Sequence, residues 1–552
     1  MAENKLAVPT IWTTGWTDCL NTGTWRNALP VHQKRVAPCY GACPVNQEIP
    51  VWNMQAKDGN YHEAWLTLVE NNPFPAITGR VCHHPCESEC NRSQYDGAVT
   101  INALEQFLGD LALEQGWALP EPEKVLEKKV AILGGGPAGL SCAYQLRRRG
   151  LQVDIYEANP ELGGMLRYGI PWCRLPKEVL DGEIQRLLAL GVEVNTGRKV
   201  KPEELSTLRE EYAAIFLAIG AQQARRLPQF PQDDGIFDGL SFLAAVNQGN
   251  SPVLGQQVTV IGGGSVAMDV ARSVRRLGSQ VKVLALEDND HLLAQAEEVR
   301  EALEEGIKIL GGVMVQGVTG NSRRFMLDCT QIVLDPAVSA GELRPVVIPG
   351  TGFMVETDNI IVAIGQDVEL SGWENELHIN NRLIDTDQNY ATSYSGVFAG
   401  GDAAGMDRFV SVAINHGKKA ADEIVRSITG EPNSVEQAEP DIVKYEEINT
   451  FYFPPTSRSE RKYRSAAERL KNIEESRIGF NSEQTREQAE RCFSCGNCVQ
   501  CDNCFYFCPD TAIVKEPALE EHYRVLDQYC KGCGTCVKEC PRGAVVLKEE
   551  SR

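Results

Sequence analysis

No run of apolar residues in this 552-residue chain approaches the roughly 20 positions that a membrane-spanning helix needs. The first residues, MAENKLAVPTIWTTGW, contain neither a basic segment nor a continuous apolar stretch, so they do not resemble a secretory signal. We therefore expect a cytoplasmic protein whose cysteines stay reduced. The chain also lacks the basic excess of nucleic-acid-binding proteins, because its formal net charge is −21. These absences predict no membrane span and no nucleic-acid partner.

Cysteine is scarce in the middle of the chain. Residues 91–491 contain only Cys142, Cys173 and Cys329, which we interpret as small core residues. The remaining cysteines gather near the two ends, six at positions 19–90 and ten at positions 492–540. In a reducing compartment such groups are better explained as metal ligands than as disulfides.

The C-terminal cysteines repeat one spacing pattern. The pattern CxxCxxCxxxCP occurs at positions 498–509 and again at positions 530–541. It resembles the pattern of bacterial ferredoxins with two 4Fe–4S clusters, in which the fourth cysteine of each motif crosses to the other cluster. The resemblance implies one cluster held by Cys498, Cys501, Cys504 and Cys540, and another held by Cys530, Cys533, Cys536 and Cys508.

A pair of zinc knuckles is the alternative for these motifs. Zinc prefers two separated ligand pairs, whereas each motif here has three close thiols and a remote one, so we favour the clusters. Cys492 and Cys495 stand outside both motifs. A docking turn would explain them, and a shifted ligand register also stays open.

Two glycine-rich turns lie in the cysteine-poor middle. In KKVAILGGGPAGLSCAYQLRRRGLQVDIYE, residues 128–157, an apolar strand precedes a GxGxxG turn, an amphipathic helix and a second strand. The stretch QQVTVIGGGSVAMDVARSVRRLGSQVKVLALE, residues 256–287, repeats this order. The candidate residues are Gly134, Gly136, Gly139 and the strand-ending Glu157 in the first unit, and Gly262, Gly264, Ala267 and Glu287 in the second.

This arrangement is typical of dinucleotide-binding sites. Glycines let the backbone approach a pyrophosphate, the helix N-terminus supplies N–H groups, and the acid accepts hydrogen bonds from a ribose. A lone GxGxxG is often only a turn, but here the strand, helix and acid accompany it twice. The sequence therefore predicts two bound dinucleotides.

The two units together resemble the two-dinucleotide flavoprotein fold of glutathione-reductase-like enzymes, in which the nicotinamide domain is inserted into the FAD domain. The stretch SGVFAGGDAAG resembles the returning FAD segment of that fold, with Asp402 as its acid. The first unit would then bind FAD and the second NAD(P)H. A disulfide reductase of this fold needs a neighbouring pair of redox-active cysteines, which the three isolated cysteines cannot supply.

The N-terminal region narrows the family. The stretches APCYGACPVNQEIPVWN, NNPFPAITGRVCHHPCESECNR and VTINALEQF resemble the iron–sulfur module that precedes the flavin domain in the glutamate synthase small subunit and in dihydropyrimidine dehydrogenase. ELGGMLRYGIPWCRLPKEV resembles the flavin-contacting segment of the same family and adds Gly164 to the FAD candidates. The ferredoxin-like tail is an addition to the basic small subunit.

The expected fold class is α/β, with two Rossmann-like domains flanked by a helical iron–sulfur domain and a ferredoxin-like domain. Within residues 431–490, the stretch RSERKYRSAAERLKNIEE is expected to form an exposed helix. We expect a helical iron–sulfur domain at 1–124, an FAD domain at 125–227 and 366–430, an inserted NAD(P)H domain at 228–365, a linker at 431–490 and a ferredoxin-like domain at 491–552.

The N-terminal ligands depart from the family pattern. Val31 and Lys34 stand where the family has two further cysteines, so one of its two N-terminal clusters lacks a full ligand set. If that cluster forms, the resemblance implies that it needs help from a further ligand, such as Cys19. The incomplete cluster would use Cys39 and Cys90. The better-supported first cluster would use Cys43, Cys82, Cys86 and Glu105. Alternatively, Glu105 is a solvated helix residue and not a ligand.

These features predict an NAD(P)H-dependent oxidoreductase that passes electrons among nicotinamide, FAD and 4Fe–4S clusters to or from a redox protein. Glu287 favours NADH because an acid there binds a ribose 2′-OH and repels a 2′-phosphate, although Arg275 or Arg276 could reach a phosphate. The acceptor stays open among a glutamate-synthase-type reductase, a ferredoxin and a dissimilatory sulfite reductase. A non-catalytic electron-relay or scaffold subunit is the alternative from another class, and association into a homo-oligomer is also open.

Overall fold

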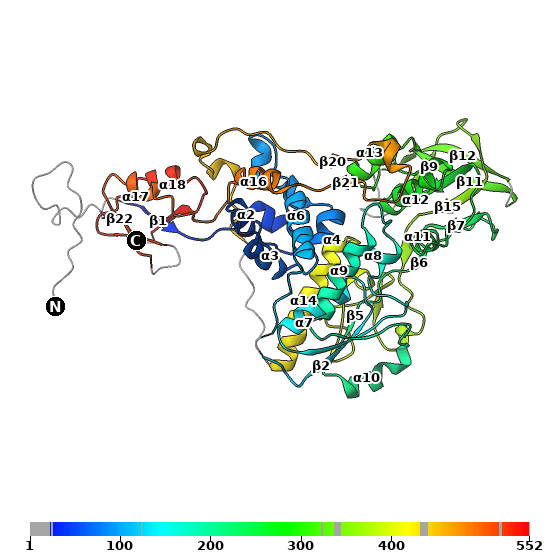
Figure 1. Cartoon of the computed structure of the whole chain (residues 1–552), viewed down its shortest axis with the longest axis horizontal. Helices are drawn as coiled ribbons and strands as arrows, with labels where there is room; N and C mark the ends of the chain where they lie inside the picture. The colour runs from blue at the N-terminus through cyan, green and yellow to red at the C-terminus, as the bar shows by residue number, and fades with distance from the viewer. Residues whose placement is uncertain are drawn as a thin grey trace, which may run out of the picture.

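The computed structural model describes residues 23, 26–122, 124–321, 324–335, 344–430, 440–517 and 522–550. The candidate ligand Cys19 lies outside these residues. The molecule is elongated, with a small cysteine-rich unit at one end, a group of helices in the middle and two nucleotide-binding sheets beyond them (Figure 1). Within the described ranges, no helix is both long and apolar enough to cross a bilayer.

Five parallel strands form the first sheet, in the order β19, β5, β2, β3, β4. Strands β2 and β5 are almost wholly buried, as expected where helices cover both faces of a parallel sheet. In this part of the described chain there are five helices, among them the short α8, Met165–Tyr168, and α7 packs along α14. The bounds are β2 Lys129–Leu133, β3 Gln152–Tyr156, β4 Glu193–Asn195, β5 Ala214–Leu217, β19 Val397–Ala399, α7 Pro137–Arg148, α9 Lys177–Leu188, α10 Leu205–Glu211 and α14 Val410–Thr429.

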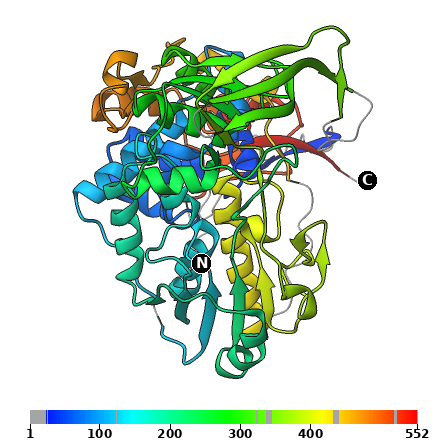
Figure 2. The ribbon, with the colours of Figure 1, turned by 90° about the vertical axis from the view of Figure 1, so that its right-hand side faces the viewer.

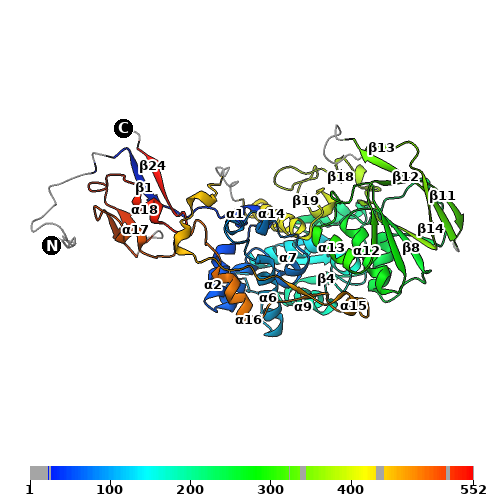
Figure 3. The ribbon, with the colours of Figure 1, turned by 90° about the horizontal axis from the view of Figure 1, so that it is seen from above.

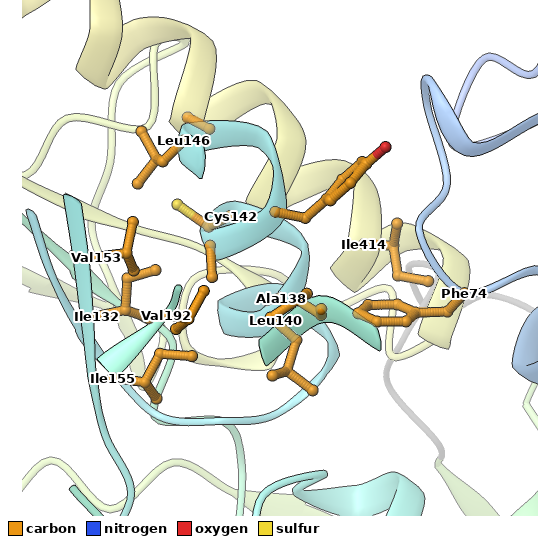
Figure 4. Close-up of a cluster of buried hydrophobic side chains, with 14 of the residues drawn as sticks. Phe74, Ile132, Ala138, Leu140, Cys142, Leu146, Val153, Ile155, Val192 and Ile414 are labelled. Atoms are coloured by element: carbon orange, nitrogen blue, oxygen red, sulfur yellow. The ribbon is translucent and has the colours of Figure 1, made fainter. Parts of the chain in front are cut away.

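The core of this region reaches into the N-terminal helices. Cys142 and Leu146 of α7 face Val153 of the sheet, while Phe74 approaches Ile414 of α14 (Figure 4). Cys142, like Cys173 and Cys329, is buried, which confirms its interpretation as a core residue. The iron–sulfur helices and the flavoprotein sheet therefore share one hydrophobic core.

The second sheet is also parallel, in the order β10, β9, β8, β15, β7. An antiparallel sheet of four strands, β11 to β14, adjoins it. The chain enters and leaves this unit through β6 Gln223–Ala224 and β16 Gln366–Asp367, which pair with each other. The other bounds are β7 Ile236–Asp238, α11 Gly239–Asn247, β8 Gln257–Ile261, α12 Ser265–Arg276, β9 Gln280–Leu284, α13 Ala296–Glu304, β10 Lys308–Leu310, β11 Val313–Asn321, β12 Arg324–Leu334, β13 Pro345–Val347, β14 Phe353–Thr357 and β15 Asn359–Val362.

The N-terminal iron–sulfur region is helical, as expected. Pro is the first or second residue of α1, α2, α4 and α5, where its missing N–H costs nothing and its fixed φ suits a helix start. The short helices leave the cysteines at their ends or in the connecting turns. The bounds are α1 Pro38–Ala42, α2 Ile49–Lys57, α3 Tyr61–Val69, α4 Pro75–Val81, α5 Pro85–Ser88 and α6 Ile101–Glu114.

The two ends of the described chain meet in one small sheet. Strand β1, Ala28–His32, pairs antiparallel with β24, Val545–Glu549, and the two lie side by side in the view from above (Figure 3). This pairing places the segment containing Val31 on the ferredoxin-like unit and not among the N-terminal helices. The unit also contains α17 Asn503–Tyr506, β22 Ile513–Lys515, β23 Tyr523–Val525 and α18 Thr535–Glu539.

The prediction of an exposed helix at residues 458–475 is wrong. The structure has only β20 Lys462–Tyr463, one helical turn, α15 Ala466–Arg469, and then β21 Arg477–Ile478. We call residues 458–478 the strap, because they run between the N-terminal helices and the second nucleotide-binding unit (Figure 2). Arg458 donates to Glu87 and Arg477 donates to Glu297 of α13, so tertiary ion pairs replace local helix formation. Helix α16, Ser482–Glu490, follows and packs on α2 and α6.

Glu305 anchors the strap in the second nucleotide-binding unit. Its buried carboxylate accepts hydrogen bonds from Arg272 and Arg276 of α12 and from Arg469 of the strap. Burial alone would raise the pKa of Glu305, but the attraction of Arg272 and Arg276 and their hydrogen bonds together outweigh burial, and the pKa lies below its usual value. Glu305 therefore stabilises the fold in its charged form, and this contribution is lost as the pH falls through that lowered pKa.

We predict that Glu305→Gln loosens the strap. The variant leaves buried guanidinium groups without their shared carboxylate, a loss that costs about 3–5 kcal/mol for buried ion pairs. Hydrogen exchange of residues 462–478 should reveal this as a lower opening free energy. The neighbouring Glu304→Gln is the control, because the Glu304 side chain is 46% exposed and its pair with Arg469 should contribute about 1 kcal/mol or less. Equal protection in the two variants would contradict the anchoring role.

Candidate cofactor sites

A cleft at the carboxyl edge of the first sheet collects most of the residues predicted to bind FAD. Its walls include Gly134, Gly136, Glu157, Gly164 and Asp402. Loops that follow β2, β3 and β5 build it, which is the usual ligand position in an open parallel sheet. The structure thus brings these five candidates together from segments that lie far apart in the sequence.

Two glycines are required by close backbone approach. A Cβ on Gly139 would lie 1.9 Å from the carbonyl oxygen of Gly134, so only glycine lets α7 approach the turn after β2. Gly164 has φ +51°, and a Cβ there would lie 2.8 Å from the Cα of Gly136. Gly139 therefore acts through helix packing, whereas Gly136 and Gly164 keep the cleft open for a phosphate-bearing ligand.

The two acids of this cleft occupy different environments. Glu157 follows β3, and its Oε2 accepts a hydrogen bond of 2.8 Å from the backbone N–H of Gly135. Its Oε1 accepts from the N–H of Asn159, so the carboxylate is held fixed at the rim of the glycine turn. Asp402 lies in a short turn after β19, and burial raises its pKa. Both side chains keep acceptor capacity for ligand hydroxyl groups.

The second glycine turn repeats this geometry. Gly262 follows β8 with φ +133°, Gly264 precedes α12, and Ala267 is buried in that helix. A Cβ on Gly263 would lie 2.5 Å from Oε2 of Glu287, so this acid also lies over the middle glycine of its turn. Glu287 comes shortly after the end of β9, a little later than expected from the sequence.

Arg275 and Arg276 do not face this turn. Arg275 donates to the carbonyl oxygens of Ser279 and Glu305, and Arg276 donates to the Glu305 carboxylate. Both lie at the C-terminal end of α12, whereas the glycine turn lies at its N-terminal end. Neither is therefore placed to bind a ribose phosphate beside Glu287.

A cavity between the N-terminal helices, which we call the first thiol cavity, gathers the predicted ligands of the first cluster. Cys43, Cys82, Cys86 and Glu105 all line it. Burial raises the pKa of the Cys43 thiol to about 11, and burial with the nearby Glu105 raises that of Cys82 to about 12. Thiols with such pKa values gain most from a bound cation, because iron takes them as thiolates.

Unsatisfied polar groups support a bound cluster in this cavity. Within the described parts of the chain, the indole N–H of Trp52, the amide of Gln47 and the hydroxyl of Ser411 are buried without a hydrogen-bond partner. All three residues line the first thiol cavity. Buried donors are rarely left unpaired, and the sulfurs of an iron–sulfur cluster are acceptors that would satisfy them.

Glu105 is not a solvated helix residue. It lies on α6, and its Oε1 accepts hydrogen bonds from Thr78 Oγ1 at 2.8 Å and Asn72 Nδ2 at 2.9 Å. Burial raises its pKa to about 7 despite these hydrogen bonds. Two polar neighbours thus hold the carboxyl group in a cavity that three thiols also line, as they would hold a ligand.

The ferredoxin-like unit brings its thiols together in two sets. Burial, Cys540 and Cys498 raise the pKa of Cys504 to about 12, whereas burial, Cys508 and Cys530 do so for Cys536. These neighbours match the crossed sets expected from the spacing, and their ligation stays a prediction. Cys498, Cys501 and Cys533 are exposed, so this unit presents its sites close to the surface.

The zinc alternative finds no support in the geometry. Among the described residues, no three His, Cys, Asp or Glu side chains lie close enough to hold a single metal ion. A tetrahedral zinc site would place its thiolates only about 3.8 Å apart, from its metal–sulfur distance.

Sequence reasoning did not place Cys492 and Cys495. The structure puts both in one cavity with Cys39 and Cys90, which we call the second thiol cavity. The CxxC spacing of Cys492 and Cys495 was the available signal, but nothing in the linear sequence joins it to cysteines near the opposite end of the chain.

Comparison with known proteins agrees with this division of the chain. Residues 128–421 match the pyridine nucleotide-disulphide oxidoreductase family. Residues 28–117 match the family described as dihydropyrimidine dehydrogenase domain II, 4Fe-4S cluster, and residues 497–544 match a 4Fe-4S dicluster domain. These matches confirm the expected fold class and its FAD, NAD(P)H and 4Fe–4S cofactors.

Three curated relatives extend over most of the chain. The NADP(+)-dependent formate dehydrogenase subunit beta of Moorella thermoacetica is 34% identical and covers 83% of this chain and 70% of its own length. The NADPH-Fe(3+) oxidoreductase subunit beta of Geobacter sulfurreducens is 31% identical, with coverage of 85% and 77%. The glutamate synthase NADPH small chain of Escherichia coli is 33% identical, with coverage of 70% and 88%, and it confirms the resemblance to that small subunit.

We predict that Glu105→Gln retains the iron of the first thiol cavity but changes its redox potential. A neutral ligand leaves the cluster less negative, so its reduction potential should rise. A rise of roughly 60 mV corresponds to a tenfold change in the equilibrium constant for one-electron reduction. Potentiometric titration followed by EPR measures this shift. Asp110→Asn is the control, because it removes a charge from the same helix α6 at a residue that pairs with Arg80 instead. A Glu105 variant with an unchanged potential would exclude Glu105 as a ligand.

Proposed function

The chain belongs to the pyridine nucleotide-disulphide oxidoreductase family, and we propose that it passes electrons between NADH and a redox protein through FAD and a row of 4Fe–4S clusters. It is an NAD(P)H-dependent iron–sulfur flavoprotein oxidoreductase. One observation carries the proposal: on α14, Ser411 lines the first thiol cavity and Ala413 lines the flavin cleft. A single helix thus separates the flavin site from the nearest cluster site.

Contacts on both sides of α14 fix this spacing. Lys418 Nζ donates to the carbonyl oxygen of Val45 at 3.3 Å and to Asn71 Oδ1 at 2.6 Å, which ties α14 to the N-terminal helices. His83, next to Cys82, stacks on Phe409 just before α14 with ring centroids 3.9 Å apart. The distance between flavin and cluster sites is therefore set by packing and not by a mobile linker.

The nicotinamide unit is held against the same cleft. Arg174 pairs with Asp269 of α12 and with Glu298 of α13, both at 2.6 Å. Trp172 Nε1 donates to the carbonyl oxygen of Asn247 at the end of α11. These contacts come from the segment that includes Gly164, so one loop can both touch FAD and orient the nicotinamide unit.

Bound FAD would accept a hydride from the nicotinamide and release the two electrons singly to the clusters. The described side chains need supply no acid or base for this step. Their role is to bind the cofactors, fix their spacing and exclude water from the thiol cavities.

NADH is the favoured nicotinamide. Glu287 is 6% exposed and lies at the glycine turn, where its charge would repel a 2′-phosphate. The two arginines that could offset this charge are bound to Glu305 and Ser279. The three relatives above have NADPH or NADP(+) in their names, so the proposed preference for NADH rests on the local residues alone.

We expect a higher kcat/KM with NADH than with NADPH when reduction of a small dye is measured. Glu287→Gln should narrow that ratio by roughly tenfold, equivalent to about 1.4 kcal/mol, because it removes the repulsion of the 2′-phosphate. Asp290→Asn, a nearby change in the exposed loop after Glu287, should leave the ratio unchanged. Preference for NADPH in the unaltered protein would refute the assignment.

The partner is proposed to be a larger redox protein or reductase subunit that meets the ferredoxin-like unit. The relatives named subunit beta and small chain are parts of larger assemblies by their names. In this chain the flavin cleft lies in the body of the molecule, whereas the exposed thiols and the exposed Tyr506 and Phe507 belong to the ferredoxin-like unit. These exposed thiols make the ferredoxin-like unit the favoured site for a large partner.

Cys540→Ser should separate the two halves of the reaction. NADH oxidation with a small dye that accepts electrons from the flavin should persist, because hydride transfer needs only the two nucleotide-binding units. Reduction of a ferredoxin should fall by tenfold or more, since Cys540 belongs to the set containing Cys498, Cys501 and Cys504. Ferredoxin reduction at the full rate would favour exit through the N-terminal clusters instead.

A further inference from the structure

We propose that the second thiol cavity holds a fourth 4Fe–4S cluster, ligated by Cys39 and Cys90 from the N-terminal region and by Cys492 and Cys495 from the C-terminal region. This assignment concerns the ligands alone and does not depend on the identity of the electron acceptor. The chain would then carry a cluster whose two pairs of ligands come from opposite ends of the sequence.

The four thiols converge on one enclosed space. All four residues line the second thiol cavity, together with Asn53, Asn91 and Arg92 among others. Cys39 and Cys495 are each only 8% exposed. Cys90 and Cys492 are half-buried. Four thiols around one enclosed space are the ligand complement of a cubane cluster.

The turn at Cys492 repeats the turns at the predicted ligands. The backbone N–H of Ser494 donates to Cys492 Sγ at 3.3 Å, and Ser494 has φ +49°. The N–H of His84 donates to Cys82 Sγ at the same distance with φ +41°. Left-handed backbone at a residue other than glycine is strained, and such strain concentrates at binding sites. Cys492 is therefore presented as a ligand and not as a structural thiol.

An unpartnered side chain points to an occupant of the cavity. Asn53 on α2 is fully buried, and within the described ranges neither its amide nitrogen nor its amide oxygen has a hydrogen-bond partner. It lines the second thiol cavity. Asn91 Nδ2 already approaches Cys495 Sγ at 3.5 Å. Cluster sulfur atoms would give the Asn53 amide the acceptor that its surroundings lack, which is the usual environment of such clusters.

One buried hydrogen bond joins the two halves of this site. Arg92, which closely follows Cys90, donates from Nη1 to the carbonyl oxygen of Arg491 at 2.7 Å, directly before Cys492. Arg491 in turn donates to the carbonyl oxygens of Ala98 and Gly97. These hydrogen bonds to the neighbouring backbone thus fix the position of one cysteine pair relative to the other.

The same structure explains the two missing family ligands. Val31 lies in β1, paired with Val546, and Lys34 pairs with Glu48 at the surface. Since β1 is committed to the ferredoxin-like unit, its residues cannot reach the second thiol cavity. The Cys492–Cys495 pair takes the place that the absent pair leaves open.

The fourth cluster would complete the row of redox sites. Ile49 and Ile101 line both thiol cavities, so the two sites adjoin. Arg542 of the ferredoxin-like unit donates from Nη1 to the carbonyl oxygen of Cys492, which joins that unit to the second thiol cavity. The cluster would receive one electron from the first cavity and pass one onward, and no bond forms or breaks in that step.

The test compares Cys492→Ser/Cys495→Ser with the unaltered full-length protein, both purified anaerobically. Four cubane clusters require about sixteen irons per chain, so the double variant should hold about twelve. One reduced-cluster EPR signal should disappear, while FAD content and NADH oxidation with a small dye stay unchanged. Cys39→Ser/Cys90→Ser should lose the same signal. Cys329→Ala, at a buried thiol in β12 away from both cavities, is the control and should keep about sixteen irons.

Unchanged iron and EPR signals in the Cys492→Ser/Cys495→Ser variant would overturn the proposal. Loss of this signal in Cys19→Ser but not in the double variant would also overturn it, because Cys19 would then supply the missing ligand. If the double variant loses FAD along with iron, the single variant Cys492→Asp decides. It keeps an anionic ligand, so a shifted EPR signal supports the proposal and an unchanged one rejects it.

Discussion

Buried arginines hold the end of the chain against its beginning, and the arrangement of the cysteines depends on them. Arg92 donates a hydrogen bond to the backbone carbonyl oxygen of Arg491. Arg35 donates hydrogen bonds to Asp441, to Glu447 and to the carbonyl oxygen of Gly543. A buried guanidinium is costly unless every donor is satisfied, so these contacts specify one arrangement of distant segments and do not merely add stability. These contacts help to bring thiols from the two ends of the chain together.

Further contacts between distant segments fix the spacing of the cofactor sites. The ferredoxin-like unit is joined to the N-terminal segment by the β1–β24 pairing and by the Arg26–Glu550 pair, and it contacts the second thiol cavity through Arg542. The strap fixes the nicotinamide unit through Glu305 and Glu297. Electrons can therefore pass through sites at fixed spacing, and no swinging domain is needed.

The sequence predicted those features that depend on short-range spacing. Each glycine turn lies close to its acid in the sequence, each copy of the cysteine motif is a short stretch, and the fold class that they implied is confirmed. The strap was mispredicted because its charges are typical of a solvated helix, whereas Arg458 and Arg477 form ion pairs with acids of the N-terminal helices and of α13. The sequence could not decide whether Glu105 is a cluster ligand or a solvated helix residue, because only the fold brings Thr78 and Asn72 to its carboxylate.

Cys492 and Cys495 mark the limit of sequence reasoning most clearly. Their CxxC spacing is visible in the sequence, but two cysteines are too few to hold a cluster. The other two thiols of the cavity come from the N-terminal region, which the Arg92–Arg491 hydrogen bond joins to this pair. Moving two ligands to the far end of the chain also changes folding: the second thiol cavity cannot be complete until residues 492–495 have docked on the N-terminal helices. Metal binding contributes folding free energy, so the fourth cluster would stabilise the docked C-terminal region as well as conduct electrons. Loading of that cluster and attachment of the ferredoxin-like unit would thereby be coupled.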